Sequence, residues 1–177
     1  LYASVGFTGD PVFLDASATP TEVEEMPTIR GIQPGTASGA SRTNATPLGT
    51  AADVGEGWTF TVTAPAGDIT DAVLAENQFN EPPPEGFRFV GVPVSMAYAG
   101  QEVSNPFTVT VKTVGDSNVE YPRECGVIPG ELDSFSDVFD GGVVQGQLCF
   151  VVPADDIGTV TLYAGAFLDV MVFFAVQ

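Results

Sequence analysis

Residues 90–100, VGVPVSMAYAG, form the stretch that decides the fold. Apolar or aromatic side chains occupy every second position from Val90 to Tyr98, which is the period of a β-strand with one buried face. Pro93 interrupts the run. Because proline offers no N–H to a neighbouring strand, it indicates an edge position or a bulge. Gly100 predicts the turn that ends the strand.

Similar alternation recurs on both sides of this stretch. It predicts further strands around the following apolar positions: Trp58, Phe60 and Val62; Phe107, Val109 and Val111; Leu148, Phe150 and Val152; Val160 and Leu162. Trp58 is expected in the core. Residues 168–176 are apolar on both faces, which predicts a central strand covered on both sides or a strand that meets a partner. Short strands separated by turn residues indicate an all-β sandwich of the immunoglobulin-like class with Greek-key connections.

Two neighbouring segments are harder to interpret. Residues 72–79 fit either a short helix or a strand. Residues 77–86 must form a loop, because three consecutive prolines cannot donate to a ladder. The aromatic-rich residues 79–89 then form either a rigid crossover between the sheets or a tip that contacts a partner.

Composition excludes several classes of function. The chain has 23 acidic residues against five basic ones, a formal charge of −18 that repels nucleic acid and anionic lipid headgroups. It has no histidine, so hydrolases that depend on a Ser-His or Cys-His pair are excluded. None of the many carboxylate pairs is singled out for glycosidase chemistry. We therefore expect no catalytic residues, no cofactor and no enzyme activity.

The acidic residues of one turn-rich stretch could in principle ligate calcium: Glu131, Asp133, Asp137 and Asp140. Their spacing matches no calcium-loop template. The pair Asp155-Asp156 offers even fewer ligands. We interpret both groups as solvated surface and predict no metal site.

Cys125 and Cys149 are the only cysteines. An even count in a β-rich chain fits an oxidising compartment, so we predict a disulfide between them; the alternative is two buried free thiols. Closing this loop would stabilise the fold by roughly 3 kcal/mol. The chain starts at Leu1 without an initiator methionine or signal-like segment, and no stretch is long enough to span a membrane. We expect a secreted, extracellular or cell-surface protein from which a signal or leader segment was removed.

The first residues carry their own strand pattern. Leu1, Ala3, Val5 and Phe7 alternate with polar or small residues, and Val12-Phe13-Leu14 follows. Residues 17–41 are rich in Thr, Pro, Ser, Gly and Glu without periodicity, which is typical of an extended linker. The sequence thus predicts an N-terminal strand at 1–16, a linker at 17–41 and a sandwich at 42–177.

Several structural motifs of the sandwich also carry a resemblance. They are Arg42-Thr43-Asn44 leading to Pro47-Leu48-Gly49, Trp58, residues 77–86 with Phe87 and Phe89, the Cys125 and Cys149 pair with residues 146–153, and Val172-Phe173-Phe174. With these motifs, residues 42–177 resemble a bacterial family of exported domains of unknown function with a telokin-like immunoglobulin fold, often lipoproteins or surface proteins. The resemblance implies fold and export and transfers no catalytic residues. The chain departs from it at residues 1–41, where a lipoprotein would carry an acylatable cysteine.

Two functions remain open. In the first, the protein is a structural subunit of a filament or surface assembly, a homopolymer in which the N-terminal strand completes the sheet of a neighbouring copy by donor-strand complementation. The strand residues would be Leu1, Ala3, Val5, Phe7, Val12, Phe13 and Leu14. In the second, the protein is a monomeric binding or adhesion module whose loops contact a surface protein or glycan.

The Asn44-Ala45-Thr46 sequon is a possible glycosylation site.

Overall fold

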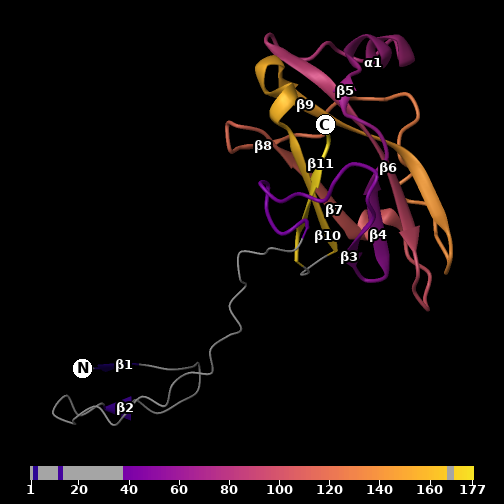
Figure 1. Cartoon of the computed structure of the whole chain (residues 1–177). Helices are drawn as coiled ribbons and strands as arrows, with labels where there is room; N and C mark the ends of the chain where they lie inside the picture. Colours follow the sequence, from indigo (N-terminus) through magenta and orange to yellow (C-terminus); the bar gives the residue numbers. More distant parts are fainter. Residues whose placement is uncertain (1, 4–11, 14–37, 167–169) are drawn as a thin grey trace. The chain divides into compact units, whose positions relative to one another are not determined.

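The structure is a computed structural model that describes residues 2–3, 12–13, 38–166 and 170–177 (Figure 1). The chain divides into two compact units, residues 1–33 and residues 34–177. In the first unit, β1 (Tyr2–Ala3) pairs antiparallel with β2 (Val12–Phe13). The predicted strand residues Leu1, Val5, Phe7 and Leu14 lie outside the described residues. The described pieces of the predicted N-terminal strand are therefore two short strands paired with each other.

The second unit contains a five-stranded antiparallel sheet with β6 (Phe87–Tyr98) at its centre. On one side, β6 pairs with β9 (Val143–Pro153) from Phe87 to Ala97. On the other side, β4 (Trp58–Val62) pairs with residues 94–98 and β5 (Gly67–Asp68) with residues 90–91. β3 (Ala52–Gly55) adds to the outer side of β4.

Pro93 lies in this central strand, so the predicted edge position is wrong, and the pairing of β6 with β9 passes Pro93 without the register shift of a bulge. The Thr63 N–H donates to the Pro93 carbonyl at 2.9 Å, just after β4 ends at Val62. In an antiparallel ladder the Pro93 nitrogen would face Thr63 as well. The hydrogen bond that Pro93 cannot donate would therefore lie between the end of β4 and the start of β5. The hydrogen bonds between β6 and β9 are not affected.

The second sheet has four strands in the order β11 (Val172–Ala175), β10 (Thr161–Ala166), β7 (Val109–Val114) and β8 (Glu120–Tyr121). The two sheets pack face to face around one core. Its largest fully buried side chains are Trp58, Phe60, Phe150, Phe174, Met96, Leu148 and Leu162. The ring centroids of Phe60 and Phe174 lie 5.0 Å apart. The prediction of an all-β sandwich is confirmed.

Three local expectations are settled by this arrangement. Residues 72–79 belong largely to a helix, α1 (Thr70–Glu76). At its first residue, the Thr70 N–H donates to the Asp68 carboxylate. Phe107 precedes β7 in a 3₁₀ turn, η1 (Pro106–Thr108), and is 69% exposed rather than on the buried face. The C-terminal strand β11 lies at the end of its sheet, so the prediction of a central strand is wrong, while the alternative of a strand that meets a partner stays a prediction.

Residues 39–46 cover the outer side of β11. The Phe173 N–H donates to the Gly39 carbonyl at 2.8 Å, and the Thr46 N–H donates to the Phe173 carbonyl at 2.7 Å. Within β11 only Phe174 is fully buried. The hydrogen-bonded sandwich therefore includes Gly39, a few residues before the predicted boundary at 42.

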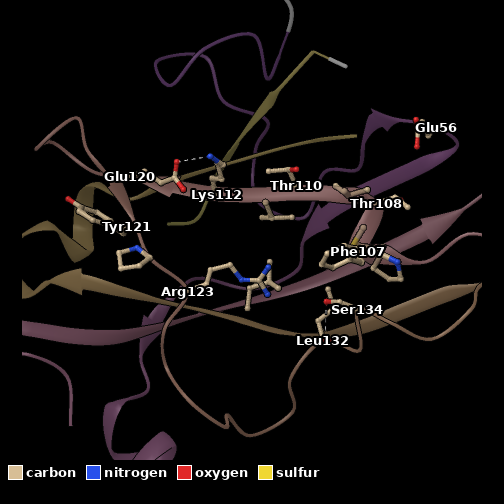
Figure 2. A pocket seen from close by; sticks show the side chains of 16 residues that line it. Glu56, Phe107, Thr108, Thr110, Lys112, Glu120, Tyr121, Arg123, Leu132 and Ser134 are labelled. Atoms are coloured by element: carbon tan, nitrogen blue, oxygen red, sulfur yellow. Dashed lines mark hydrogen bonds and ion pairs between the residues drawn. The ribbon is translucent and has the colours of Figure 1, made fainter. Parts of the chain in front are cut away.

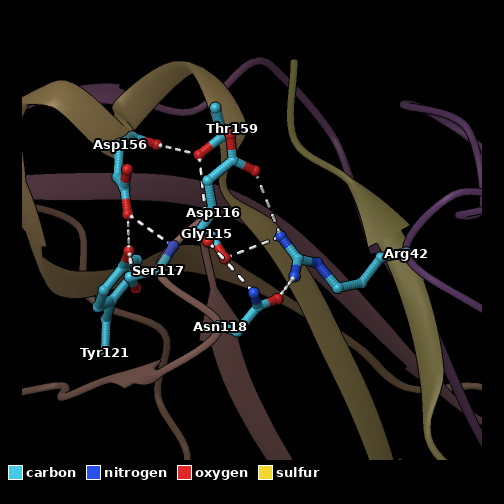
Figure 3. Close-up of polar contacts among 8 residues, drawn as sticks. All are labelled: Arg42, Gly115, Asp116, Ser117, Asn118, Tyr121, Asp156 and Thr159. Atoms are coloured by element: carbon cyan, nitrogen blue, oxygen red, sulfur yellow. Dashed lines mark hydrogen bonds and ion pairs between the residues drawn. The ribbon is translucent and has the colours of Figure 1, made fainter.

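A cluster of polar contacts fixes the start of the sandwich to the turn between β7 and β8 (Figure 3). The Arg42 guanidinium donates to Asn118 Oδ1 at 2.6 Å and to the Gly115 carbonyl at 2.8 Å. The Tyr121 hydroxyl donates to the carboxylate of Asp156, in the 3₁₀ segment η2 (Ala154–Thr159). These contacts hold β8 in place at one end of β7.

The disulfide between Cys125 and Cys149 is present, with a Cα–Cα distance of 6.1 Å. It belongs to a smaller apolar cluster with Val73 of α1, Phe89, Ile128 and Val151. Because Cys149 and Val151 alternate with the core residues Leu148 and Phe150, this cluster lies on the opposite face of the five-stranded sheet. The bridge thus ties the segment after β8 to β9. None of the helices in the described part of the chain is long and apolar enough to cross a membrane.

Candidate functional site

A hollow of about 660 Å³ opens between the two sheets beside β7 (Figure 2). Its floor includes Met96 of β6 and Leu148 of β9, both fully buried, and its wall includes Val109 and Val111 of β7. Leu132 lines the opposite wall. The hollow therefore runs along the side of the sandwich, directly over buried core residues.

The edge of β7 beside this hollow is open. On its other edge, β7 pairs with β10 along all six residues from Val109 to Val114. On the side of the hollow, β8 pairs only with Thr113 and Val114. Within the described ranges no strand pairs with this edge between Val109 and Lys112. Unpaired N–H and C=O groups of such an edge are a template for another strand.

The path of the chain after β8 explains why the edge stays open. Pro122 follows directly after the two residues of β8 and has no N–H to continue the ladder. Its carbonyl instead accepts the Val151 N–H at 2.9 Å, so the chain crosses from the four-stranded sheet to β9. The disulfide at Cys125 then holds it there. The local sequence and the bridge together keep β8 short.

Arg123 is one of two basic side chains that line the hollow, and Lys112 is the other. It extends across the opening in Figure 2, and its Cζ lies 6.0 Å from the centroid of the buried Phe150 ring. Desolvation lowers the pKa of Arg123, and the negative charge of Glu131 opposes this shift; the guanidinium stays protonated at neutral pH. No carboxylate of the described chain lies within 4.0 Å of it, whereas Arg42, Arg88 and Lys112 each form an ion pair.

Charged side chains mark the β8 end of the hollow. Lys112 Nζ lies 2.8 Å from Glu120 Oε2, and this contact raises the pKa of Lys112. The Tyr163 hydroxyl donates to the same carboxylate at 3.4 Å. The ion pair is largely exposed to solvent, so it contributes little to stability.

Two aromatic rings mark the other end. Phe107 and Phe135 stack with their centroids 5.2 Å apart, and both are exposed, Phe135 at 74%. A second hollow of about 410 Å³ continues here and shares Phe107, Arg123 and Leu132 with the first. The two hollows form one groove, which we call the β7 groove, from Lys112 past Arg123 to Phe135.

The predicted acidic surface shows no converging ligands. Asp133 accepts the N–H groups of Phe135 and Ser136 at 3.0 Å, together with the Ser136 hydroxyl, and these bonds lower the pKa of Asp133. It therefore shapes the turn that presents Phe135. In the described part of the chain, no group of three or more Asp, Glu, Cys or His side chains could hold a metal ion.

The other sequence-predicted positions are spread over the molecule. Ala3, Val12 and Phe13 lie in β1 and β2. Asn44 lies in a turn whose N–H donates to the Ser41 carbonyl at 3.1 Å, and Thr46 of the sequon is buried. The sequon is thus part of the folded sandwich and not of an open linker. Glycosylation of Asn44 remains a prediction.

Sequence reasoning missed the open edge of β7 and the position of Arg123. The usable signal was local: Pro122 directly follows an apolar tyrosine, and Arg123 is one of only five basic residues. It could not show that the Phe150 ring lies near the guanidinium, because that contact joins the segment after β8 to β9.

Comparison with known proteins gives similarity of fold alone. No family model matches the chain, and no curated protein matches it. Three solved structures resemble the sandwich and cover 71 to 73% of the chain. A conserved hypothetical protein from Bacillus anthracis is 14% identical, with 94% of its length covered and a TM-score of 0.45. An uncharacterized β-sandwich protein from Clostridium difficile is 10% identical, with 91% covered and a TM-score of 0.45.

The third, a candidate lipoprotein from Bacillus subtilis, is 13% identical with a TM-score of 0.49, and only 37% of its length is covered. Identities this low assign no family and no activity.

Proposed function

We propose that this protein is a non-enzymatic structural subunit of an extracellular or cell-surface assembly, joined by insertion of the N-terminal strand of one copy into the β7 groove of the next. The observation that carries the proposal is the open edge of β7 beside a hollow lined by apolar core residues. The edge offers main-chain hydrogen bonds, and the floor at Met96 and Leu148 offers apolar contact. Strand addition uses both.

The first residues of the chain have the composition that such a groove would accept. Leu1, Ala3, Val5 and Phe7 share one face of an extended segment, so they could enter the groove while the intervening residues face solvent. The predicted linker at 17–41 could span about 80 Å when extended. A neighbouring copy is therefore within reach.

The pairing of β1 with β2 supplies an alternative state of the same segment. An isolated two-stranded ladder is at best marginally stable in water, whereas an added strand in a sandwich gains a covered face. Insertion would replace the weak pairing by a stronger one. Repeated from copy to copy, this contact does not close on itself and builds a filament.

The disulfide supports the proposed compartment. A buried bridge between Cys125 and Cys149 is typical of proteins that fold in oxidising surroundings. Export of a precursor, followed by removal of a leader segment, belongs to this proposal. A precursor sequence and the mature N-terminus, measured by mass spectrometry, would test it.

Light scattering and electron microscopy of the full chain over a range of concentrations test the assembly. The Phe7→Asp variant should remain monomeric at concentrations where the wild type assembles, because a carboxylate on the inserted face cannot enter an apolar floor. Thr8→Asp, on the opposite face, is the matched control and should assemble normally. Equal behaviour of the two variants would count against strand insertion.

Cross-linking separates insertion into a neighbour from folding back into the same chain. One tagged copy carries Thr110→Cys, at an exposed position on β7, and a second copy with a different tag carries Ser4→Cys. A thiol-reactive cross-linker should join the two tags. In a chain that carries both cysteines, a product that stays monomeric at every concentration would show insertion in cis and overturn the polymer.

One observation favours a second candidate function, a monomeric binding or adhesion module. The exposed stack of Phe107 and Phe135 is a flat apolar surface of the kind that contacts a partner or a sugar ring. A single monomeric species at all concentrations, together with loss of ligand binding in Phe135→Ala, would favour this function over assembly.

A further inference from the structure

The hollow of about 410 Å³ at the Phe135 end of the β7 groove differs from the open edge of β7, because the N–H groups beside it are already used. The Phe107 N–H donates to the Ser134 carbonyl at 2.9 Å. The next two N–H groups, those of Thr108 and Val109, donate to carbonyls of the preceding turn. A strand added to β7 therefore gains no hydrogen bond from these donors. An occupant of this hollow must be held mainly by side chains.

Two exposed aromatic rings form one wall of the hollow. Phe107 is 69% exposed and Phe135 is 74% exposed, and their stacked rings have centroids 5.2 Å apart. The buried side chain of Leu132 lines the hollow beside them. The Asp133 carboxylate accepts the Phe135 N–H at 3.0 Å, which orders the turn that carries this ring. The rings thus form an apolar platform that is in place before a ligand arrives.

Side chains that donate and side chains that accept surround this platform. Arg123 extends towards Phe107 and Ser134 in Figure 2 and can only donate. It is exposed, and it forms no ion pair with a carboxylate of the described ranges. Glu131 and Asp133 line the same hollow and can only accept. A ligand that fits this hollow must therefore both donate and accept hydrogen bonds.

The charges of the hollow select against charged ligands. A net charge of −18, with Glu131 and Asp133 beside the platform, repels an anion. A cation on the platform would meet the guanidinium of Arg123. An uncharged molecule with many hydroxyl groups avoids both penalties, and each hydroxyl can donate as well as accept. A pyranose ring adds an apolar C–H face that covers an aromatic ring. A sugar combines all of these properties.

We propose that the Phe135 end of the β7 groove is a binding subsite for an uncharged glycan. One pyranose ring lies on the rings of Phe107 and Phe135, and its hydroxyl groups bond to Arg123 and Glu131. The volume of the hollow falls within the range of about 300–1,000 Å³ that is typical of small-molecule sites. This inference rests on the second candidate function, the binding module, and names its ligand class. It does not require strand insertion, which uses the open edge of β7.

Saturation-transfer NMR of the full chain tests the subsite, because it detects weak binding to a monomer and to an assembly alike. The uncharged probes are cellohexaose and N-acetylated chitohexaose. Deacetylated chitohexaose is the cationic control, and a hexamer of galacturonic acid is the anionic one. When the aromatic protons of the protein are saturated, an uncharged probe should receive transfer at its ring C–H protons, and the charged probes should receive less. The absence of transfer to both uncharged probes at millimolar concentration, or stronger transfer to a charged probe, would overturn the proposal.

Variants then locate the contact. Phe135→Ala should raise the dissociation constant of the uncharged probe on the order of tenfold, because it removes half of the platform, and Phe135→Tyr should retain binding. Arg123→Met should weaken binding by a similar factor through the lost hydrogen bond. Phe139→Ala is the matched control: Phe139 is also 69% exposed but is not among the residues that line the hollow. It should bind as the wild type does. Equal weakening by Phe135→Ala and Phe139→Ala would overturn the assigned position, and thermal unfolding establishes that each variant is folded.

The outcomes separate this inference from both candidate functions. A wild type that binds an uncharged probe but never assembles would support the subsite and remove strand insertion. Assembly that Phe7→Asp abolishes, without transfer to either uncharged probe, would overturn the subsite and leave strand insertion standing. Loss of partner binding in Phe135→Ala, again without transfer to either probe, would overturn the glycan as ligand. The binding module would then stand with a protein partner.

Discussion

At the scale of single residues, Gly39 shows how one backbone position holds the start of the sandwich. Its φ is +85°, and an added Cβ would lie 2.5 Å from Val172 Cγ1 and 2.7 Å from Thr46 Oγ1. Gly49 has a similar φ of +75°, but a Cβ there would meet nothing within 4 Å. A substitution at either glycine would strain the backbone, but only a substitution at Gly39 would also produce a steric clash.

We predict that Gly39→Ala destabilises the protein by about 2–3 kcal/mol and Gly49→Ala by about 1 kcal/mol, because only the first adds a clash to the strained φ. Urea unfolding followed by tryptophan fluorescence measures both, since Trp58 is buried. Equal losses of stability for the two variants would contradict this prediction. They would show that residues 39–46 shift to accommodate the added methyl group without a further loss of unfolding free energy.

Tyr121 gives a second prediction at this scale. Burial of the ring and its hydrogen bond to Asp156 raise the pKa of Tyr121 above its ordinary value. The folded state therefore favours the protonated phenol, so this contribution is fully present below about pH 10 and is lost as the pH rises through the folded-state pKa. The stability of the wild type should fall more steeply than that of Tyr121→Phe above about pH 10. Urea unfolding at pH 8 and at pH 10.5 measures the difference, and parallel declines would contradict it.

At the scale of elements, period-two alternation was sufficient to predict the strands that build the core. Val90, Val92, Val94 and Met96 are all buried, as are Leu148, Phe150 and Val152. The alternation could not reveal pairing partners. Pro93 therefore suggested an edge, although its missing donor faces the gap between β4 and β5. The C-terminal strand was misjudged for a similar reason, because its cover comes from residues 39–46, which show no periodicity of their own.

The candidate site was less predictable than the fold. The two cysteines could be paired because there are only two, but the open edge of β7 depends on where the chain crosses after Pro122. That crossing is a long-range event between sheets. No local pattern in residues 109–112 distinguishes an edge that is open from one that is paired.

The disulfide should stabilise the element that keeps this edge open. Replacing both Cys125 and Cys149 by alanine should lower the free energy of unfolding by roughly 3 kcal/mol, because the unfolded chain loses its loop constraint. Reductant should lower the urea midpoint of the wild type towards that of the double variant and leave the variant unchanged. A double variant as stable as the wild type would show that the smaller core around Val73 and Ile128 holds the segment without the bridge.

At the scale of the whole molecule, the two compact units of the chain suggest a direct competition experiment. A synthetic peptide of residues 1–15 should occupy the β7 groove and block assembly of the full chain as its concentration rises. It should also raise the thermal midpoint, because a ligand that binds only the folded state stabilises it in proportion to RT ln(1 + [L]/Kd). A peptide with Val5 and Phe7 changed to aspartate, which keeps the length and loses the apolar face, should do neither.

Light scattering and differential scanning fluorimetry on the same samples follow both effects. The reason to expect them together is that assembly and stabilisation would use one surface, the edge of β7 and the floor at Met96 and Leu148. A peptide that raises the midpoint without shortening the assemblies would place polymer contacts elsewhere on the sandwich. A peptide that changes neither the thermal midpoint nor the assembly would contradict binding in the β7 groove. It would favour the exposed pair Phe107 and Phe135 as the surface that binds a partner.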